Sequence, residues 1–264
     1  MHCASQHTTQ GAAMAPVRTA CTPLPTCVVF AAGEYYHEPI DVPPGAFVVA
    51  ADGGYDHARE LGVQVNAVVG DFDSVYSARS AIGAETVALP PQKDDPDLLS
   101  ALKIGWAHGG RAFHIYGGLG GRVDHTISNI QQLAFIAAHG GIAFLHGAGQ
   151  IVTAICDAAL TFPAHPVHGT QYISVFAHSD EARGVDERGL AYELHDATMT
   201  NLQVNGLSNE FVDGLGAEVR VRRGLLTVVF DAAAPLPTLV GAPAAAGTLG
   251  APSTHVSAAL ADRG

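Results

Sequence analysis

The sequence predicts an α/β protein, with an N-terminal parallel-sheet (Rossmann-like) domain followed by a smaller antiparallel β-sandwich domain. In the first half, short apolar runs alternate with amphipathic helical patterns, which is typical of βαβ units with buried strands. After about Ile151 the helical patterns fade, and strand-like runs follow one another. We therefore expect an α/β domain over residues 27–150 and a β domain over residues 151–234.

The elements of the first domain follow in chain order. The candidate strands are short apolar runs: Val28–Ala32, Phe47–Ala51, Ala67–Val69, Phe113–Tyr116 and Ile142–Leu145. The candidate helices are Tyr55–Leu61, Asp97–His108 and about Asp124–His139. The second helical pattern places four apolar side chains on one face, namely Leu98, Ala101, Leu102 and Trp106. This is the face expected to pack on a sheet.

The second domain is expected to consist of strands. These are Tyr172–Phe176, Leu190–Leu194, Ala217–Arg222 and Leu225–Phe230, with the last two joined at Arg223-Gly224. The flanking segments, residues 1–26 and 235–264, lack periodicity, and the second is rich in Ala, Pro and Gly. We predict that both flanking segments are disordered.

The composition excludes several classes of protein. A 48% apolar content is that of a folded chain, and a net charge of −12 with only 13 Lys and Arg argues against nucleic-acid binding. No apolar run approaches the roughly 20 residues of a membrane-spanning helix. The four cysteines lack metal-site spacing, and the first 26 residues lack the features of a signal peptide. We expect a cytoplasmic protein with no nucleic-acid or membrane partner.

Acidic residues and glycines follow four of the predicted strands. They are Gly33-Glu34, Asp52-Gly53-Gly54, Gly70-Asp71-Phe72-Asp73-Ser74 and the run from Gly117 to His125. Ligands of open parallel sheets bind beyond the carboxyl ends of the strands, so these residues are expected to share one site.

Asp71 and Asp73 are the strongest metal candidates. In extended backbone their carboxylates point to one side, and a divalent cation would relieve their repulsion. Mg²⁺ takes one or two carboxylates together with waters and substrate phosphates. A polar turn, in which Asp71 and Ser74 bond the backbone, is the alternative. Asp52, expected on a neighbouring strand end, favours the metal site.

The run Lys93-Asp94-Asp95-Pro96-Asp97 precedes a predicted helix. Asp95 as N-cap, Pro96 at the first helical position and Asp97 in the first turn would suit a helix start. Capping does not use Lys93 or Asp94, which remain candidates for binding phosphate and metal.

The run from Gly117 to Asp124 reads as a strand end, a glycine-rich loop and a helix start. It matches neither the P-loop nor the dinucleotide-binding pattern. Backbone N–H groups at a helix start still bind anions, and glycines allow close approach. Arg122 would add a bidentate phosphate contact. Asp124 is a helix cap or a substrate contact, and His125 is either a structural residue or a site residue.

Taken together, these motifs resemble those of the thiamine pyrophosphokinases. The motifs occur in the family's order: Asp52-Gly53-Gly54, Gly70–Ser74, Lys93-Asp94 with Asp97, Gly117–His125 followed by Asn129, and Ser208-Asn209. The resemblance covers about residues 28–231. It implies transfer of a diphosphate from Mg-ATP to thiamine by a homodimer with sites at the subunit interface.

The resemblance also implies roles for individual residues. Asp71, Asp73 and Asp94 would be Mg²⁺ ligands, with Asp52 nearby. ATP would contact Gly53, Lys93, Asp97, Gly118, Gly120, Gly121 and Arg122. Asp124 would orient the substrate, and the thiamine contacts would be His125, Asn129, Ser208 and Asn209.

Two positions depart from the family pattern. Pro96 stands where the family usually has Thr, which removes a hydroxyl. The one Trp, Trp106, falls on an N-terminal helix, so a ring stacking on thiamine would have to be Tyr or Phe, with Phe211 a candidate. The alternative functions are a pyrophosphokinase for a pterin alcohol and a nucleotide-binding sensor without turnover.

Overall fold

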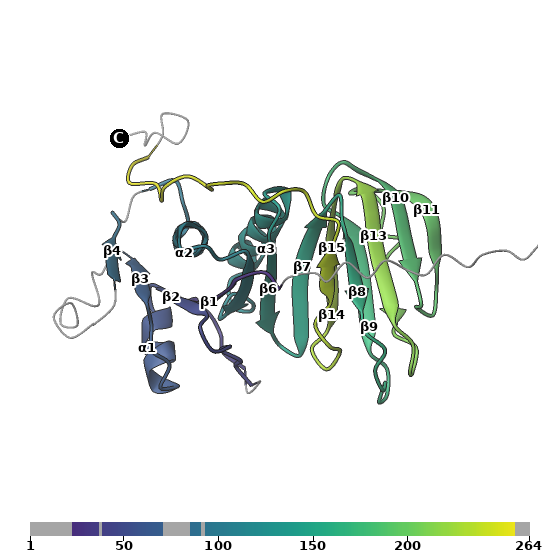
Figure 1. The fold of residues 1–264 in the computed structure, drawn as a ribbon, viewed down its shortest axis with the longest axis horizontal. Helices are drawn as coiled ribbons and strands as arrows, with labels where there is room; N and C mark the ends of the chain where they lie inside the picture. Colours follow the sequence, from purple (N-terminus) through teal and green to yellow (C-terminus); the bar gives the residue numbers. More distant parts are fainter. Residues whose placement is uncertain (1–22, 37–38, 71–84, 91–92, 257–264) are drawn as a thin grey trace, which may run out of the picture.

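The computed structural model of the 264-residue chain describes residues 23–36, 39–70, 85–90 and 93–256 (Figure 1). Its helices are α1 (Gly54–Glu60), α2 (Asp97–Ala107) and α3 (Val123–Ala138). The larger sheet contains β1 (Thr26–Phe30), β2 (Phe47–Ala51), β3 (Ala67–Gly70), β4 (Glu85–Ala88), β5 (Ala112–Tyr116), β6 (Ile142–Gly147), β7 (Gln150–Cys156), β9 (Tyr172–Ala177), β12 (Asn209–Glu210) and β14 (Leu225–Asp231). The smaller sheet contains β8 (Ala159–Phe162), β10 (Glu181–Arg188), β11 (Leu194–Thr200), β13 (Ala217–Arg223) and β15 (Thr238–Val240).

The N-terminal part of the larger sheet is parallel, in the order β6-β5-β1-β2-β3-β4. Helices α2 and α3 pack on one face, where Leu102 and Leu133 join Val29 in a common core. Helix α1 and the loop before β2 cover the other face, where Ala58 packs with Phe30. The strands β6, β5, β1, β2 and β3 are almost entirely buried, as expected of a sheet covered on both faces, whereas the edge strand β4 is mostly exposed. The predicted α/β fold class is confirmed.

Strand β1 lies at a topological switch point. The chain leaves β1 for β2 on one side, and later passes through α2 to β5 on the other side. The strand order therefore reverses at β1, which leaves a crevice beyond the carboxyl ends of β1, β2 and β5.

Beyond β6 the larger sheet becomes antiparallel, through β7, β14, β9 and β12. The five-stranded sheet packs on this part, and the two sheets share one core. Among its members are Ile155, Val175 and Leu226 from the larger sheet and Leu160, Val185 and Val219 from the smaller. This is the predicted antiparallel sandwich. However, the predicted boundary at residue 150 does not separate the sheets, because β7, β9, β12 and β14 continue the larger one.

The strands of the β domain show two features that the sequence patterns did not reveal. Strands β13 and β14 are joined at Arg223-Gly224, as predicted, but they do not pair with each other: β13 pairs with β10 and β8, and β14 pairs with β7 and β9. Gly224, with a φ of 117°, therefore connects two sheets instead of closing a hairpin. The predicted strand Leu190–Leu194 is also displaced, since β11 begins at Leu194 and Leu190 forms only an isolated bridge to Phe211. Apolar alternation marks buried positions but does not identify the pairing partner.

The segment after residue 234 differs from the prediction of disorder. It forms β15, which pairs with β8, and then a stretch that we call the C-terminal strap (residues 241–256). The strap passes over α3 and α2 (Figure 1). Hydrogen bonds to backbone groups of the strap fix its path. Such bonds do not depend on the strap's side chains, so a composition rich in Ala, Pro and Gly does not predict them. Residues 1–22 and 257–264 lie outside the described residues, so disorder there stays a prediction.

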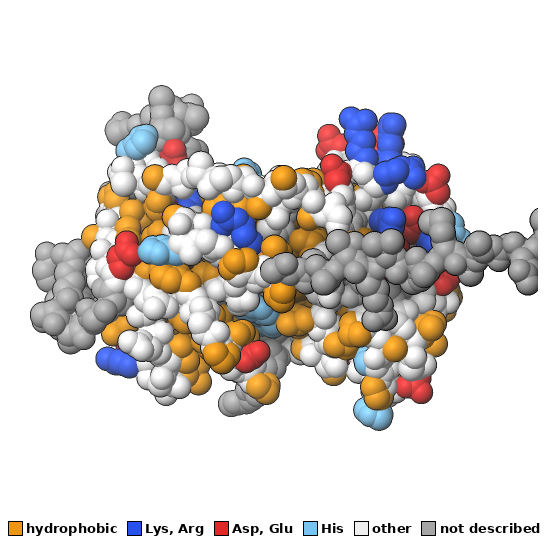
Figure 2. Space-filling model, viewed as in Figure 1, with side chains coloured by type: hydrophobic (Ala, Val, Ile, Leu, Met, Phe, Trp, Pro, Cys, Tyr) orange, Lys and Arg blue, Asp and Glu red, His pale blue; other side chains and the backbone are white. Residues whose placement is uncertain are grey.

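The exposed face of the smaller sheet carries a cluster of basic side chains over β10 and β13 (Figure 2). Most of these arginines are paired with acids: Arg183 with Glu181, Arg188 with Asp186, Arg220 with Glu218 and Arg222 with Asp196. No helix of the described residues is both long and apolar enough to cross a membrane.

His114 on β5 and His146 on β6 form a pair under the loop that precedes β2. Nδ1 of His114 lies 3.0 Å from Nε2 of His146, and the Tyr116 ring stacks on His146 at 4.7 Å. Burial and the neighbouring His114 lower the pKa of His146 to about 3, and burial lowers the pKa of His114 although Asp41 opposes this. The pair is therefore neutral at pH 7.

This pair makes stability depend on pH. Below pH 6.5 an unfolded histidine takes up a proton that folded His146 does not, so stability is lost as the pH falls from 6.5 towards 3. Between pH 6 and 5, the free energy of unfolding should drop by about 1.4 kcal/mol per pH unit for this histidine. Urea unfolding at each pH measures the slope. The variant His146→Asn should show a smaller slope, and equal slopes in the two proteins would contradict the assignment.

Candidate active site

A cavity of about 720 Å³ occupies the crevice at the switch point. Three strand ends line it: Ala31–Glu34 after β1, Ala51-Asp52 at the end of β2 and Gly117–Arg122 after β5, although Leu119 is not among the lining residues. The starts of two helices complete the wall, with Pro96, Asp97 and Leu98 from α2 and Asp124, His125, Ser128 and Asn129 from α3. The predicted convergence of the motifs at this edge of the sheet is thus present for these residues.

The glycine-rich loop wraps closely around the start of α3. Gly120 and Gly121 have φ values of 85° and 63°, a region that L side chains rarely adopt. A Cβ on Gly120 would also overlap the side chains of Tyr36 and Glu34. Asn129 ties the loop to the helix, because its Nδ2 donates to the Gly118 carbonyl at 2.8 Å. The loop therefore presents backbone to the cavity at a helix N-terminus, an arrangement suited to anions.

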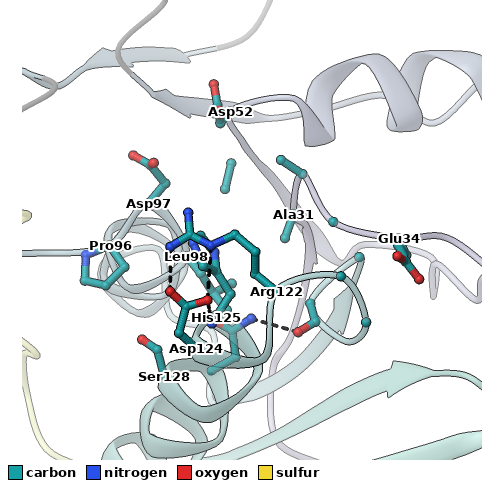
Figure 3. Close-up of a pocket in the computed structure, with 18 residues that line it drawn as sticks. Ala31, Glu34, Asp52, Pro96, Asp97, Leu98, Arg122, Asp124, His125 and Ser128 are labelled. Atoms are coloured by element: carbon teal, nitrogen blue, oxygen red, sulfur yellow. Dashed lines mark hydrogen bonds and ion pairs between the residues drawn. The ribbon is translucent and has the colours of Figure 1, made fainter.

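Arg122 and Asp124 lie at the mouth of the cavity and bind each other (Figure 3). The guanidinium donates from Nε to Oδ1 of Asp124 at 3.1 Å and from Nη2 to Oδ2 at 2.5 Å. This hydrogen bonding lowers the pKa of Asp124 and raises the pKa of Arg122. Both side chains are largely exposed, so the pair contributes little to stability. Each is free to exchange its partner for a ligand.

The Lys93–Asp97 segment is arranged differently from the prediction. Asp95 does not cap α2, because Pro96 occupies the N-cap position and no side chain makes a capping hydrogen bond to the start of the helix. Asp97 lines the cavity, and its Oδ1 lies 2.9 Å from the buried Nζ of Lys93. Neither Lys93 nor Asp94 lines the cavity, and Asp94 donates its backbone N–H to the His255 carbonyl at 3.3 Å.

Comparison with known families matches both halves of the chain. The family model described as "Thiamin pyrophosphokinase, catalytic domain" matches residues 44–144, which contain every lining residue except Ala31–Glu34. The model described as "Thiamin pyrophosphokinase, vitamin B1 binding domain" matches residues 162–226. Together the two matches span more than half of the chain. The chain belongs to the thiamin pyrophosphokinase family.

Solved structures of this family share the fold. Thiamine pyrophosphokinase from Bacillus subtilis is 21% identical with a TM-score of 0.67, over 78% of this chain and 98% of that one. The family protein from Enterococcus faecalis is 21% identical with a TM-score of 0.65, over 78% and 98% of the two chains. The yeast thiamin pyrophosphokinase is 13% identical with a TM-score of 0.61, over 80% and 87%. No curated protein matched the chain.

Asp52 stands at the end of β2 in a left-handed conformation, with a φ of 49°. Its backbone N–H donates to the Val69 carbonyl at 2.7 Å, and its side chain lines the cavity. Gly70 lies against it, because a Cβ on Gly70 would be 3.3 Å from the Asp52 Cα. The next residues, including Asp71 and Asp73, lie outside the described residues.

The donor chemistry of the cavity fits Mg²⁺. Asp52, Asp97 and Glu34 bring carboxylates from three segments to its wall (Figure 3). Among the residues that the structure describes, no three His, Cys, Asp or Glu side chains are grouped closely enough to hold a metal by themselves. Mg²⁺ usually takes one or two carboxylates and completes its shell with waters and phosphates, so a sparse oxygen wall suits it.

The Asp52-Gly53-Gly54 motif shows which glycine the fold requires. A Cβ on Gly54 would overlap the carbonyl oxygen of Phe30, whereas a Cβ on Gly53 would make an ordinary contact 3.4 Å from the Cβ of Ala32. The variant Gly54→Ala should therefore lower the free energy of unfolding by about 3 kcal/mol, as in overpacked cores. Gly53→Ala is the matched control and should cost less than about 1 kcal/mol. Equal midpoints in urea for the two variants would contradict this reading.

Ser208 and Asn209 lie in the B1-binding half and do not line the described cavity. Ser208 is exposed with a φ of 60°, and Asn209 is buried. Asn209 uses both amide hydrogens and both acceptor sites of its carbonyl within the chain, through Tyr192, Glu187 and Glu210. Phe211 is a buried core residue that packs edge-on against Phe162, so it is not available to stack on a ligand.

The sequence analysis missed one polar residue of the cavity wall. Ser128 lines the cavity although no motif singles it out; only its position four residues after Asp124 could have suggested it. Glu34 also lines the cavity, as expected from its place after the first predicted strand. His125 and Asn129 both line the cavity, and the Asn129 side chain holds the glycine loop. Their contacts with thiamine stay predictions. Trp106 lies on α2 and is buried in the core, as its position on the apolar face of the predicted helix indicates.

Proposed function

We propose that this member of the family transfers a diphosphate from Mg-ATP to the thiamine hydroxyl, giving thiamine diphosphate and AMP. The observation that carries the proposal is the cavity at the switch point, in which a glycine-rich loop, an arginine and several carboxylates meet. Backbone N–H groups and a guanidinium suit a polyphosphate, and the carboxylates suit both its cation and a cationic acceptor.

In this proposal the Arg122–Asp124 pair opens when ATP binds. Phosphate oxygens would replace the Asp124 carboxylate as partners of the Arg122 guanidinium. Asp124 would then accept a hydrogen bond from the thiamine hydroxyl and orient it towards the β-phosphorus. Phosphoryl-type transfer depends mainly on positioning and on stabilising developing charge, so this needs no strong base.

Mg²⁺ would neutralise charge on the polyphosphate. From the sequence motifs, Asp71, Asp73 and Asp94 would hold it, with Asp52 nearby; Lys93 would act on the phosphates directly or by holding Asp97. The 2.9 Å Lys93–Asp97 ion pair supports the second role for Lys93.

We also propose a homodimer in which Ser208 faces the cavity of the other subunit. The B1-binding half exposes several apolar side chains that are close to Ser208 in the sequence or through the sheet: Tyr172, Tyr192, Leu202, Val204 and Leu207. Tyr172 lies opposite Glu210 in the sheet, and the Tyr192 backbone bonds Asn209, so the patch is continuous with the Ser208-Asn209 turn. Such a patch suits a subunit interface. Light scattering coupled to gel filtration tests the mass, and Leu202→Asp should shift it towards monomer.

The rival functions differ in the acceptor. The match to a vitamin B1 binding domain favours thiamine over a pterin alcohol, and the match to a catalytic domain favours turnover over sensing. AMP release from Mg-ATP, measured by chromatography with thiamine, with hydroxymethyl-dihydropterin or without acceptor, separates them. AMP and thiamine diphosphate appearing only with thiamine would support the proposal. AMP appearing only with the pterin, or in no reaction, would refute it. The cytoplasmic location stays a prediction.

A further inference from the structure

The C-terminal strap lies beyond residue 226, where the match to the B1-binding domain ends. It crosses from the β-sandwich over α3 and α2 to the segment that precedes α2 (Figure 1). It therefore connects the far end of the chain with residues that border the cavity, and neither matched domain includes it.

The middle of the strap is anchored on the α/β core. The Trp106 indole donates from Nε1 to the Ala246 carbonyl at 3.1 Å, and the Ala246 N–H donates to the His139 carbonyl at 2.9 Å. Leu249 is buried in the core that contains α2 and α3. The anchor points lie on residues that are themselves packed, so the strap has a defined path.

The end of the strap is held by Asp95. Oδ2 of Asp95 accepts from the Ser253 backbone N–H at 2.8 Å and from Lys103 Nζ at 2.6 Å. The side chains of Asp95 and Lys103 are only 11% and 12% exposed. Lys103 also donates to the Ala251 carbonyl at 3.2 Å, and the His255 carbonyl accepts from the Asp94 N–H at 3.3 Å. The strap is thus joined to residues 94–95 chiefly by a charged hydrogen bond to the Asp95 carboxylate, which is largely shielded from solvent.

The other side of the same segment forms the cavity wall. Pro96, Asp97 and Leu98 line the cavity, and Asp97 is paired with Lys93. No side chain caps the start of α2, so the helix does not itself fix the backbone before it. The strap contacts therefore restrain residues 94–95, which directly precede the lining residues Pro96 and Asp97.

We propose that the C-terminal strap is a positioning element of the nucleotide site and that Asp95 is its positioning residue. The strap holds residues 93–97 in the conformation that presents Asp97 to the cavity. This rests on the proposed function in so far as the cavity binds Mg-ATP. It gives Asp95 a role different from helix capping and gives the strap a role in the reaction.

The test compares two substitutions at one position. Ser253→Pro removes the N–H that Asp95 accepts, whereas Ser253→Ala keeps that N–H and loses only the hydroxyl, which donates to the His255 carbonyl. Ser253→Pro should raise the KM for Mg-ATP at least about fivefold and leave the KM for thiamine within about twofold, the size expected for losing one hydrogen bond to a charged group. Ser253→Ala should behave like the wild type. Asp95→Ala should reproduce the effect of Ser253→Pro.

Two further readouts do not depend on activity. Trp106 is the chain's one Trp, so intrinsic Trp emission reports the strap anchor, and deletion of residues 241–264 should shift it to longer wavelength. Hydrogen exchange at residues 93–100 should be faster in Ser253→Pro than in Ser253→Ala. If the wild type shows no thiamine-dependent AMP release, the proposed function fails, and the exchange comparison still tests the strap.

Either of two results would overturn the proposal. One is a lowered melting temperature of Ser253→Pro with a wild-type KM for Mg-ATP, which would make the strap a stabilising segment only. The other is equal hydrogen exchange at residues 93–100 in the two Ser253 variants, which would show that the strap does not restrain the segment.

Discussion

Arg122→Ala should lower kcat/KM for Mg-ATP by about a hundredfold or more, the size found for removing a donor that stabilises developing charge. Arg122 is the one cationic side chain among the described residues that line the cavity, apart from the titratable His125. Its guanidinium is already oriented there by Asp124. Steady-state AMP release at varied Mg-ATP measures the effect. Arg122→Lys should recover only part of it, because an ammonium lacks the planar fork.

The matched control is Arg183→Ala. Arg183 is also an exposed arginine paired with an acid two residues away, Glu181, but it lies on the β-sandwich. Its loss should leave kcat/KM unchanged. Both variants should unfold at the wild-type midpoint, since exposed ion pairs contribute little to stability. A similar loss of activity in both, or in neither, would remove Arg122 from the nucleotide site.

Asp71→Asn should lower turnover by about a hundredfold or more. This is the loss expected when a group that stabilises developing charge in the transition state is removed. This expectation rests on the two-residue spacing of Asp71 and Asp73 and on their position directly after β3. The described end of β3 lies against Asp52, on the cavity wall. Loss of one carboxylate should also raise the Mg²⁺ concentration needed for half-maximal rate, which a titration of AMP release with Mg²⁺ measures.

Asp56→Asn serves as the control for charge alone. Asp56 is exposed on α1, where it pairs with Arg59 at 3.3 Å, and it does not line the cavity. It should keep wild-type turnover and Mg²⁺ dependence. A wild-type rate for Asp71→Asn at every Mg²⁺ concentration would show that the metal assignment is wrong.

The parallel sheet illustrates what local patterns can predict. The predicted strand Phe47–Ala51 agrees with β2, and the predicted helix Asp97–His108 agrees with α2 to within one residue. These elements are short buried runs or amphipathic helices, whose periodicity results from burial on both faces of the sheet. The convergence of the motifs at one edge of the sheet could also be predicted from the sequence, because the carboxyl ends of parallel strands meet there.

The β-sandwich illustrates where such patterns fail. Strands β13 and β14 adjoin in sequence across Gly224 but belong to different sheets, and β7 extends the larger sheet although it follows the predicted boundary. The alternation of apolar and polar residues indicates which side chains are buried. It does not indicate the sheet, because both sheets of a sandwich bury the same kinds of side chain. Pairing depends on partners far away in the chain, and no local pattern encodes them.

For the candidate site, the sequence by itself determined the family, the cavity's place in the fold and most of its polar wall, because glycines, acids and Arg122 adjoin the strand ends in the chain. Only the tertiary structure decided that Arg122 is held by Asp124, that Asn129 holds the glycine loop and that Asp95 binds the strap instead of capping α2. Each of these depends on which hydrogen-bonding groups come together once the chain has folded. The Asp95–Ser253 contact joins residues 158 positions apart, and nothing near Asp95 in the sequence signals it.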